Sequence, residues 1–174
     1  TPTTYIKCLR PITLFNYLID KISDSETSSD SSFLDGTHEN KVITSFDSIR
    51  NLENAKLKTN LKDFFDSINY YLNACLIYDN QNNICQLEAK NYVYDNSTIV
   101  VNLGEVKELE IVPFTSELFA KLKSNSNDYT YDSVNGKDEF NTENEFLSPI
   151  TAMTNEKNML APYRTDMYGI ELTR

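Results

Sequence analysis

Apolar residues recur with helical spacing in the first seventy positions of the chain. Residues 12–22 read ITLFNYLIDKI, and Pro11 before them suits the first turn of a helix. A longer helix is predicted over residues 46–71, with Ser45 as its N-cap and a break near Asn60 as the alternative. The apolar face of the first helix is formed by Ile12, Phe15, Ile19 and Ile22, widened by Leu14 and Leu18.

Alternation of apolar and polar residues predicts strands in the middle of the chain. Residues 71–79 and 84–95 flank the polar turn-like sequence NQNN, and two further strands are expected at 98–103 and 106–112 around a glycine. Residues 3–9 alternate in the same way. Each strand has one polar face, which is typical of an antiparallel sheet with one side in water.

These elements predict one α+β domain that spans residues 1–174. A short helix over residues 116–123, SELFAKLK, completes the set. We expect a mainly antiparallel meander sheet of about four to five strands, packed against one long helix and two shorter helices. A chain of this length buries a core without disulfides or metals.

Two stretches lack any apolar periodicity. Residues 23–41 carry five acidic residues against one lysine and include SDSETSSDSS, and residues 124–145 carry six acidic residues against one lysine. Together they account for nearly all of the net charge of −10. Ordering a residue costs about 1–2 kcal/mol of backbone entropy, which polar sequence does not offset by apolar burial. We therefore expect two flexible acidic insertions in a nearly neutral domain.

The first insertion contains candidate phosphorylation sites. Ser23, Thr27 and Ser32 each have an acidic residue three positions later, an arrangement that acid-directed kinases favour. Phosphate there would add strong negative charge. Serines beside acidic residues also arise by chance in such tracts, so a plain solvated loop is the alternative.

The C-terminal segment, residues 146–174, is irregular but rich in apolar and aromatic residues. Exposing that much apolar surface is unfavourable, so the segment either wraps over its own domain or docks on another chain. Methionine-rich surfaces adapt well to partners. For the docking alternative we predict these partner contacts: Phe146, Leu147, Met153, Met159, Leu160, Tyr163, Met167 and Tyr168.

The sequence offers few groups for catalysis or for cofactors. The single histidine, His38, lies in the first acidic insertion, where we expect it to be exposed, and the four glycines are too far apart for a dinucleotide or P-loop motif. Cys8, Cys75 and Cys85 are too scattered for a zinc site or a disulfide framework, and we expect buried free thiols. Glu108 and Glu110 form an acid pair or a solvated strand edge. No metal or cofactor is predicted.

The remaining hypothesis is a non-catalytic protein-interaction domain, a scaffold, adaptor or subunit of a larger intracellular assembly. Its partner would be a protein, with a basic patch as one option; Lys56, Lys58 and Lys62 are interleaved with acids, which disfavours nucleic acid. No apolar run is long enough to span a membrane. The free thiols favour the cytoplasm or nucleus, and the absence of an initial Met fits an excised domain or processed product.

Two alternatives stay open. A secreted or surface-exposed ligand-binding domain would fit the glycosylation triplet at Asn96 and the composition rich in Thr, Ser and Asn. An enzyme with a carboxylate-only site is the third hypothesis.

Overall fold

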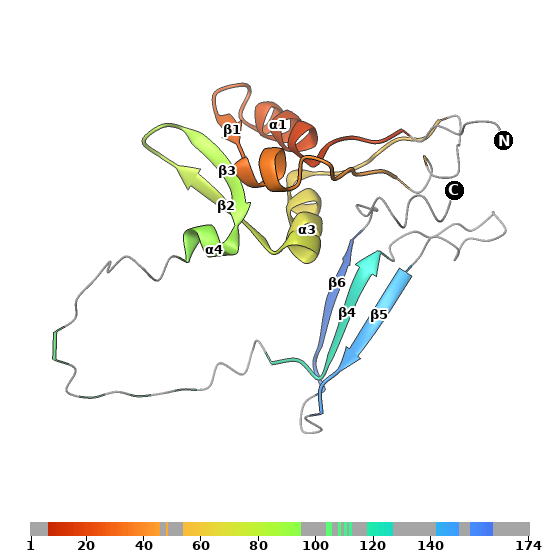
Figure 1. Ribbon diagram of the computed structural model, residues 1–174, viewed down its shortest axis with the longest axis vertical. Helices are drawn as coiled ribbons and strands as arrows, with labels where there is room; N and C mark the ends of the chain where they lie inside the picture. The colour runs from red at the N-terminus through yellow and green to blue at the C-terminus, as the bar shows by residue number, and fades with distance from the viewer. Residues whose placement is uncertain are drawn as a thin grey trace.

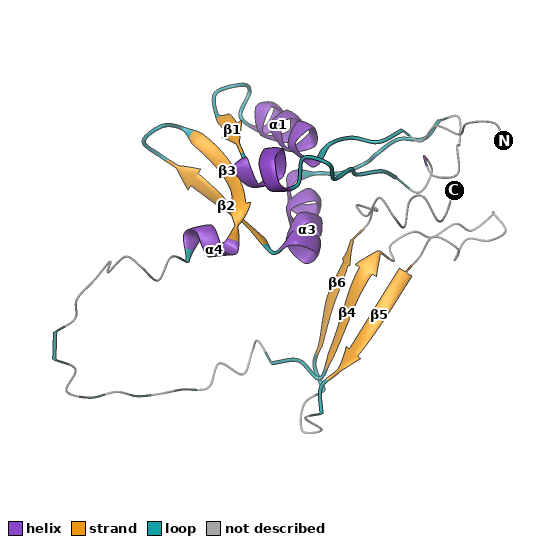
Figure 2. Ribbon diagram, viewed as in Figure 1, coloured by secondary structure: helices purple, strands orange, loops and turns teal. Residues whose placement is uncertain are grey.

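The computed structural model describes residues 7–45, 48, 54–94, 104–105, 108, 110, 112, 118–126, 142–149 and 154–161. These residues form an α+β structure with two three-stranded sheets, ordered β1-β3-β2 and β5-β4-β6 (Figure 2). Each sheet contains one parallel and one antiparallel pair, so the prediction of a mainly antiparallel meander is wrong.

In chain order, the helices described come first, among three of the strands, and the last three elements described are strands (Figure 1). In chain order they are α1 (Pro11–Ile22), β1 (Ser28–Asp30), the π-helical turn η1 (Phe33–Thr37), α3 (Leu61–Leu72), β2 (Ala74–Asp79), β3 (Ile84–Ala89), the single turn α4 (Lys90–Val93), β4 (Lys121–Ser126), β5 (Thr142–Leu147) and β6 (Glu156–Ala161).

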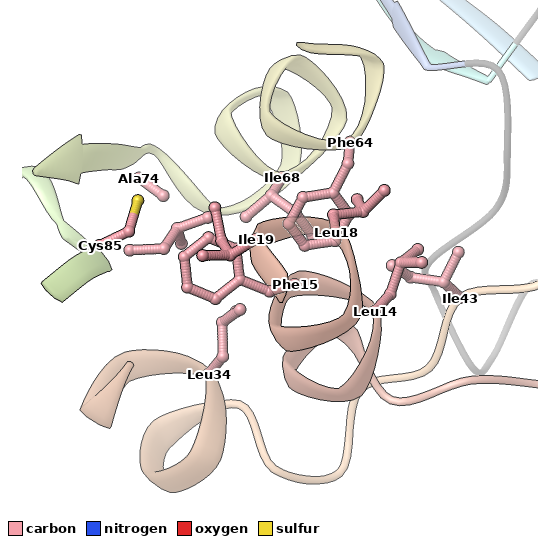
Figure 3. Close-up of a cluster of buried hydrophobic side chains, with 11 residues drawn as sticks. Leu14, Phe15, Leu18, Ile19, Leu34, Ile43, Phe64, Ile68, Ala74 and Cys85 are labelled. Carbon is pink, nitrogen blue, oxygen red and sulfur yellow. The ribbon is translucent and has the colours of Figure 1, made fainter. Parts of the chain in front are cut away.

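Helix α1 supplies the centre of the hydrophobic core. The predicted helix over 12–22 is confirmed, and Pro11 occupies its first turn. Its apolar face is centred differently from the prediction, because Ile22 lies in solvent. Phe15 stacks on Phe64 of α3, with 6.1 Å between the ring centroids. Leu34 of η1 points at Phe15 from the other side (Figure 3). The buried residues of α1 are Pro11, Leu14, Phe15, Leu18 and Ile19.

Helix α3 is shorter than the helix predicted over 46–71. Residues 55–60 are not helical, and the helix begins after Asn60, whose side-chain oxygen accepts the N–H of Asp63 at 2.9 Å. This N-cap satisfies a backbone donor at the helix start, so the break near Asn60 is the correct alternative. Asn73 ends the helix with φ +54°, a left-handed conformation that asparagine tolerates.

Strands β2 and β3 form the predicted hairpin around the polar turn. The register places Cys75 opposite Glu88 and Tyr78 opposite Cys85, so the two thiols do not face each other, as expected. Strand β3 ends at Ala89, earlier than predicted, and α4 follows it. All three cysteines are free, but only Cys85 is buried as expected: Cys75 is half-buried and Cys8 is exposed.

The first acidic insertion, residues 23–41, has more structure than the sequence led us to expect. Its residues Ser28–Asp30 form β1, which pairs in parallel with β3, and Phe33–Thr37 form η1. Leu34 is fully buried in the core. The error lay in treating the tract as uniformly polar, since Phe33 and Leu34 directly follow SDSETSSDSS and fix it to the core.

The second half of the chain departs furthest from the prediction. Residues 121–126 form β4, so the helix expected over 116–123 is wrong there. The described residues of the strand expected at 106–112, namely Glu108, Glu110 and Val112, are not in a strand. Strand β4 and most of β5 fall within or beside the second acidic stretch, 124–145. The predicted strand at 98–103 and residues 127–141 lie outside the described residues.

Candidate functional site

Strand β5 lies at the edge of the second sheet and ends in two exposed apolar residues. It pairs with β4 on one side, and within the described part of the chain no strand pairs with its other side. Phe146 is 58% exposed and Leu147 is 75% exposed. Strand β6 contacts α3, and in Figure 1 its C-terminal end lies nearer α3 than its N-terminal end. Leu147 pairs with Lys121, which pairs with Glu156 at the start of β6, so Phe146 and Leu147 lie at the end of the sheet away from α3.

The hydrogen-bond pattern identifies which backbone groups of β5 face outward. The N–H of Ser148 donates to the carbonyl of Ala120 at 2.8 Å, just beyond the pair Lys121–Leu147. In an antiparallel ladder, every second residue directs its N–H and C=O to the same neighbour. Phe146 therefore directs its backbone groups at β4, while Glu145 and Leu147 direct theirs away from β4. The outer edge of β5 thus offers a row of backbone donors and acceptors.

One face of the second sheet is an ion-pair network. Lys121 and Lys123, two apart on β4, both contact Glu145 of β5, at 2.6 Å and 3.5 Å. Both also lie 3.7 Å from Glu156 of β6. Exposed ion pairs contribute little each, but a network that joins three strands fixes their register.

The opposite face of the sheet carries two neighbouring apolar side chains, Leu122 and Phe146, among mostly polar ones. Leu122 pairs with Phe146 on one side and with Lys157 on the other, so the three side chains form one row. The ammonium of Lys157 also lies 5.0 Å from the ring centre of Phe119. Only Phe146 of this row is strongly exposed.

The structure divides the predicted partner contacts between two faces. Phe146 and Met159 occupy positions on the face opposite the ion-pair network, whereas Leu147 and Leu160 occupy positions on the ion-pair face. A single continuous strip is therefore not formed by these four. Met153, Tyr163, Met167 and Tyr168 lie outside the described residues. Sequence reasoning missed Leu122, because KLKSNS was assigned in part to a helix although its first three residues alternate.

A second surface feature is a polar cleft beside α1, with a volume of about 460 Å³. Hydrogen bonds tie its walls together: the hydroxyl of Ser29 donates to Asn16 at 2.9 Å, and the amide of Asn83 donates to the carbonyl of Glu26 at 2.6 Å. Every lining residue is polar, so the cleft suits a ligand rich in hydrogen-bonding groups. The lining is Asn16, Asp20, Ser25, Glu26, Thr27, Ser28, Ser29, Asn82 and Asn83.

The three candidate phosphorylation sites lie in different surroundings. The hydroxyl of Ser23 donates to the carbonyl of Ile19 at 2.9 Å and accepts the N–H of Thr27 at 3.1 Å, which closes the end of α1. Thr27 is half-buried, and its hydroxyl contacts Asn83. Ser32 is exposed and contacts Glu88.

The candidate groups for catalysis do not converge on one site within the described residues. His38 is half-buried rather than exposed, and it packs edge-on against Phe33 with 4.4 Å between the ring centroids. Burial, and then the charge of Lys41, lowers the pKa of His38. Burial raises the pKa of the Cys75 and Cys85 thiols, which makes them poor nucleophiles. Among the described residues, no group of three or more His, Cys, Asp and Glu side chains is placed to hold a metal ion.

The three lysines that the sequence interleaves with acids lie before and at the start of α3, and the glycosylation triplet is not described. Lys56 and Lys58 precede α3, and Lys62 forms an ion pair of 2.6 Å with Asp66. Asn96 lies outside the described residues. Of the helices that the structure describes, none has both the length and the apolar character that a membrane crossing requires.

Comparison with known proteins gives no relative. No family model matches the chain, and neither a curated protein nor a solved structure is significantly similar to it.

Proposed function

We propose that this chain is a non-catalytic protein-interaction domain, which adds an extended segment of a partner protein to the outer edge of β5. The observation that carries the proposal is the exposed pair Phe146 and Leu147 on a strand whose outer edge has no strand partner in the described part of the chain. An exposed hydrophobic edge strand is a template for pairing with another chain.

The energetics favour a covered edge. Fully burying a Phe or Leu side chain stabilises a complex by about 1.5–3 kcal/mol relative to leaving it exposed. The outward N–H and C=O groups of Glu145 and Leu147 would gain regular partners in the same step. Phe146 and Leu147 project to opposite faces, so a partner strand with its apolar residues on one face packs them against one of the two, and its polar residues lie beside the other.

Charge gives the partner a preferred sign. The chain carries a net charge of −10, so a positively charged segment approaches faster than a neutral one, and salt weakens this steering. The partner we propose is therefore a basic, extended segment that also contains apolar residues. A scaffold or adaptor role within an assembly is consistent with this type of contact.

Peptide binding tests the proposal. The probe is a fluorescent eight-residue peptide with Lys and Val at alternating positions, and its control has the same composition with the lysines grouped at one end. Fluorescence anisotropy should show saturable binding of the alternating peptide that weakens as salt is raised. Leu147→Pro should reduce binding about tenfold or more, because proline removes an outward N–H without touching the ladder to β4.

A matched variant separates edge binding from general stickiness. Tyr17 on α1 is 58% exposed, the same fraction as Phe146. Phe146→Ser should weaken peptide binding, whereas Tyr17→Ser should leave it unchanged. Equal losses from the two variants, or equal binding of the two peptides, would contradict a specific site on β5.

The polar cleft supports a second candidate, a ligand-binding domain for a small hydroxylated compound. It also contains two carboxyl groups, Asp20 and Glu26, which favour a cationic ligand and keep a carboxylate-dependent enzyme as the third hypothesis. Saturation-transfer NMR with glucose and glucosamine tests the ligand-binding role, which is supported if binding is seen and is lost in Asn16→Ala. Turnover of a nitrophenyl glycoside tests the enzyme, which is supported if turnover is seen and is lost in Asp20→Asn. If neither binding nor turnover is detected, the cleft does not bind a ligand of this class.

A further inference from the structure

A buried carboxylate on β3 is held by one serine of the first acidic insertion. Glu88 is only 5% exposed. The N–H of Ser32 donates to Oε1 of Glu88 at 2.8 Å, and the Ser32 hydroxyl lies 3.2 Å and 3.1 Å from the two carboxylate oxygens. Among the described residues, no Lys or Arg forms an ion pair with Glu88. The charge of Glu88 is therefore satisfied mainly by Ser32.

The same contact fastens a larger segment to the core. Next to it, the Ser31 hydroxyl donates to the carbonyl of Leu87 and accepts the N–H of Leu34 at 3.0 Å. Leu34 is fully buried beside Phe15 (Figure 3). On the other side, β1 pairs with β3 over only three residues. Ser32 thus lies at the centre of the contacts that fix residues 28–37.

We propose that Ser32 is a phosphorylation site and that a phosphate there releases residues 28–37 from β3. The Ser32 oxygen would attack the γ-phosphorus of ATP in a protein kinase, forming the O–P bond as the bond to ADP breaks, and the hydroxyl proton would pass to a base of the kinase. The product oxygen carries no hydrogen, so the hydrogen bond from the Ser32 hydroxyl to Glu88 is lost and only the Ser32 N–H remains as a donor to it. Up to two negative charges then stand beside a buried carboxylate, which like-charge repulsion and desolvation disfavour.

Ser32 fits this role better than the other two candidates. It is exposed, whereas Ser23 and Thr27 are half-buried. Its acidic neighbour at the third following position, Asp35, lies on the surface, in an ion pair of 2.9 Å with Arg10. Neither Ser23 nor Thr27 contacts a buried charge through its hydroxyl. The proposal is independent of the β5 edge.

The first experiment places phosphoserine at position 32 by genetic code expansion and follows amide hydrogen exchange by NMR. The Leu34 amide should exchange about tenfold faster or more, which corresponds to a loss of about 1.4 kcal/mol of local stability. The matched control is phosphoserine at position 25, because the Ser25 hydroxyl also contacts a carboxylate, Asp20 at 2.7 Å, but an exposed one. That control should change Leu34 exchange less than twofold.

A charge-removing variant tests the cause. In Glu88→Gln the phosphate at Ser32 no longer faces a second negative charge. The effect of the phosphate on Leu34 exchange should therefore shrink to a few-fold. An undiminished effect in Glu88→Gln, or equal effects from the two phosphoserines, would overturn the proposed mechanism. Phosphotransfer is tested on the unmodified chain with an acid-directed kinase and ATP. Mass spectrometry should locate phosphate at Ser32. The site would be overturned if Ser32 of the full chain carried no phosphate although the isolated 28–40 peptide was phosphorylated.

Discussion

The two sheets of this protein use similar residue types in opposite ways. In the first region, α1, η1, α3 and the sheet β1-β3-β2 converge on one core, and Phe64 is fully buried. In the second, the sheet β5-β4-β6 has an ion-pair network on one face, and its Phe146 is 58% exposed. A phenylalanine is buried when neighbouring elements also present apolar faces, and β5 has only one row of such neighbours.

The sharpest way to test this contrast is the same substitution in both regions. Phe64→Ala should lower the free energy of unfolding by about 3–5 kcal/mol, because it leaves a cavity in the core. Phe146→Ala should change it by less than about 0.5 kcal/mol, as expected at an exposed position. Chemical denaturation measures both. A large loss from Phe146→Ala would show that the second sheet is part of the core.

Leu34 tests whether the first acidic insertion belongs to the core region. Leu34→Ala should destabilise the protein by about 2–5 kcal/mol, since the side chain is fully buried. Leu147→Ala on β5 is the matched control and should be nearly neutral. If both leucines prove neutral in thermal unfolding, the insertion is not packed as the structure shows.

The start of α3 gives a smaller effect within the core region. Asn60→Ala removes the side-chain acceptor for the N–H of Asp63 and should cost about 1 kcal/mol. Asn80→Ala, in the exposed turn after β2, is the control and should cost less than about 0.5 kcal/mol. Equal costs in urea unfolding would mean that Asn60 does not act as the cap.

The ion-pair network should contribute little but depend on salt. Lys121→Met removes contacts to Glu145 and Glu156 and should cost less than about 1 kcal/mol at low ionic strength. The cost should decrease further in 1 M NaCl, where the Debye length falls to about 3 Å. A salt-independent cost would point to packing of the lysine stem instead.

His38 gives the smallest effect and a defined direction with pH. Its pKa in the folded protein is lowered from 6.5 by burial and by Lys41, so the unfolded chain binds the proton more readily. The contribution of His38 to the free energy of unfolding is therefore fully present above about pH 6.5. It is lost as the pH falls from 6.5 through the pKa of His38 in the folded protein. His38 is the only histidine, so His38→Gln should remove this component from the pH profile of unfolding. An identical profile in the variant would contradict the shift.

Local patterns of the core region could be read from sequence, and long-range ones could not. Helix α1 and the β2–β3 hairpin follow from spacing and turn residues that lie close together in the chain. The parallel pairing of β1 with β3 joins residues more than fifty positions apart, and no short pattern encodes it. The helix predicted over 46–71 is interrupted, since residues 55–60 are not helical and the Asn60 side chain caps the start of α3.

The candidate site was predicted only in part. Phe146 and Leu147 were selected as exposed apolar contacts, and both are exposed on β5. Their division between two faces follows from strand periodicity, which an irregular segment does not reveal. The edge position of β5 depends on the order β5-β4-β6, and a sequence does not state which strand lies outermost.

Amide hydrogen exchange along β5 tests the central claim, an open edge that binds an extended chain, most directly. In the free protein, the amides of Phe146 and Ser148 should be protected by β4, while those of Glu145 and Leu147 should exchange rapidly. Addition of the alternating Lys and Val peptide should slow exchange at Glu145 and Leu147 and leave Phe146 unchanged. Protection of Glu145 and Leu147 in the free protein would show that the edge is already covered and would contradict the account.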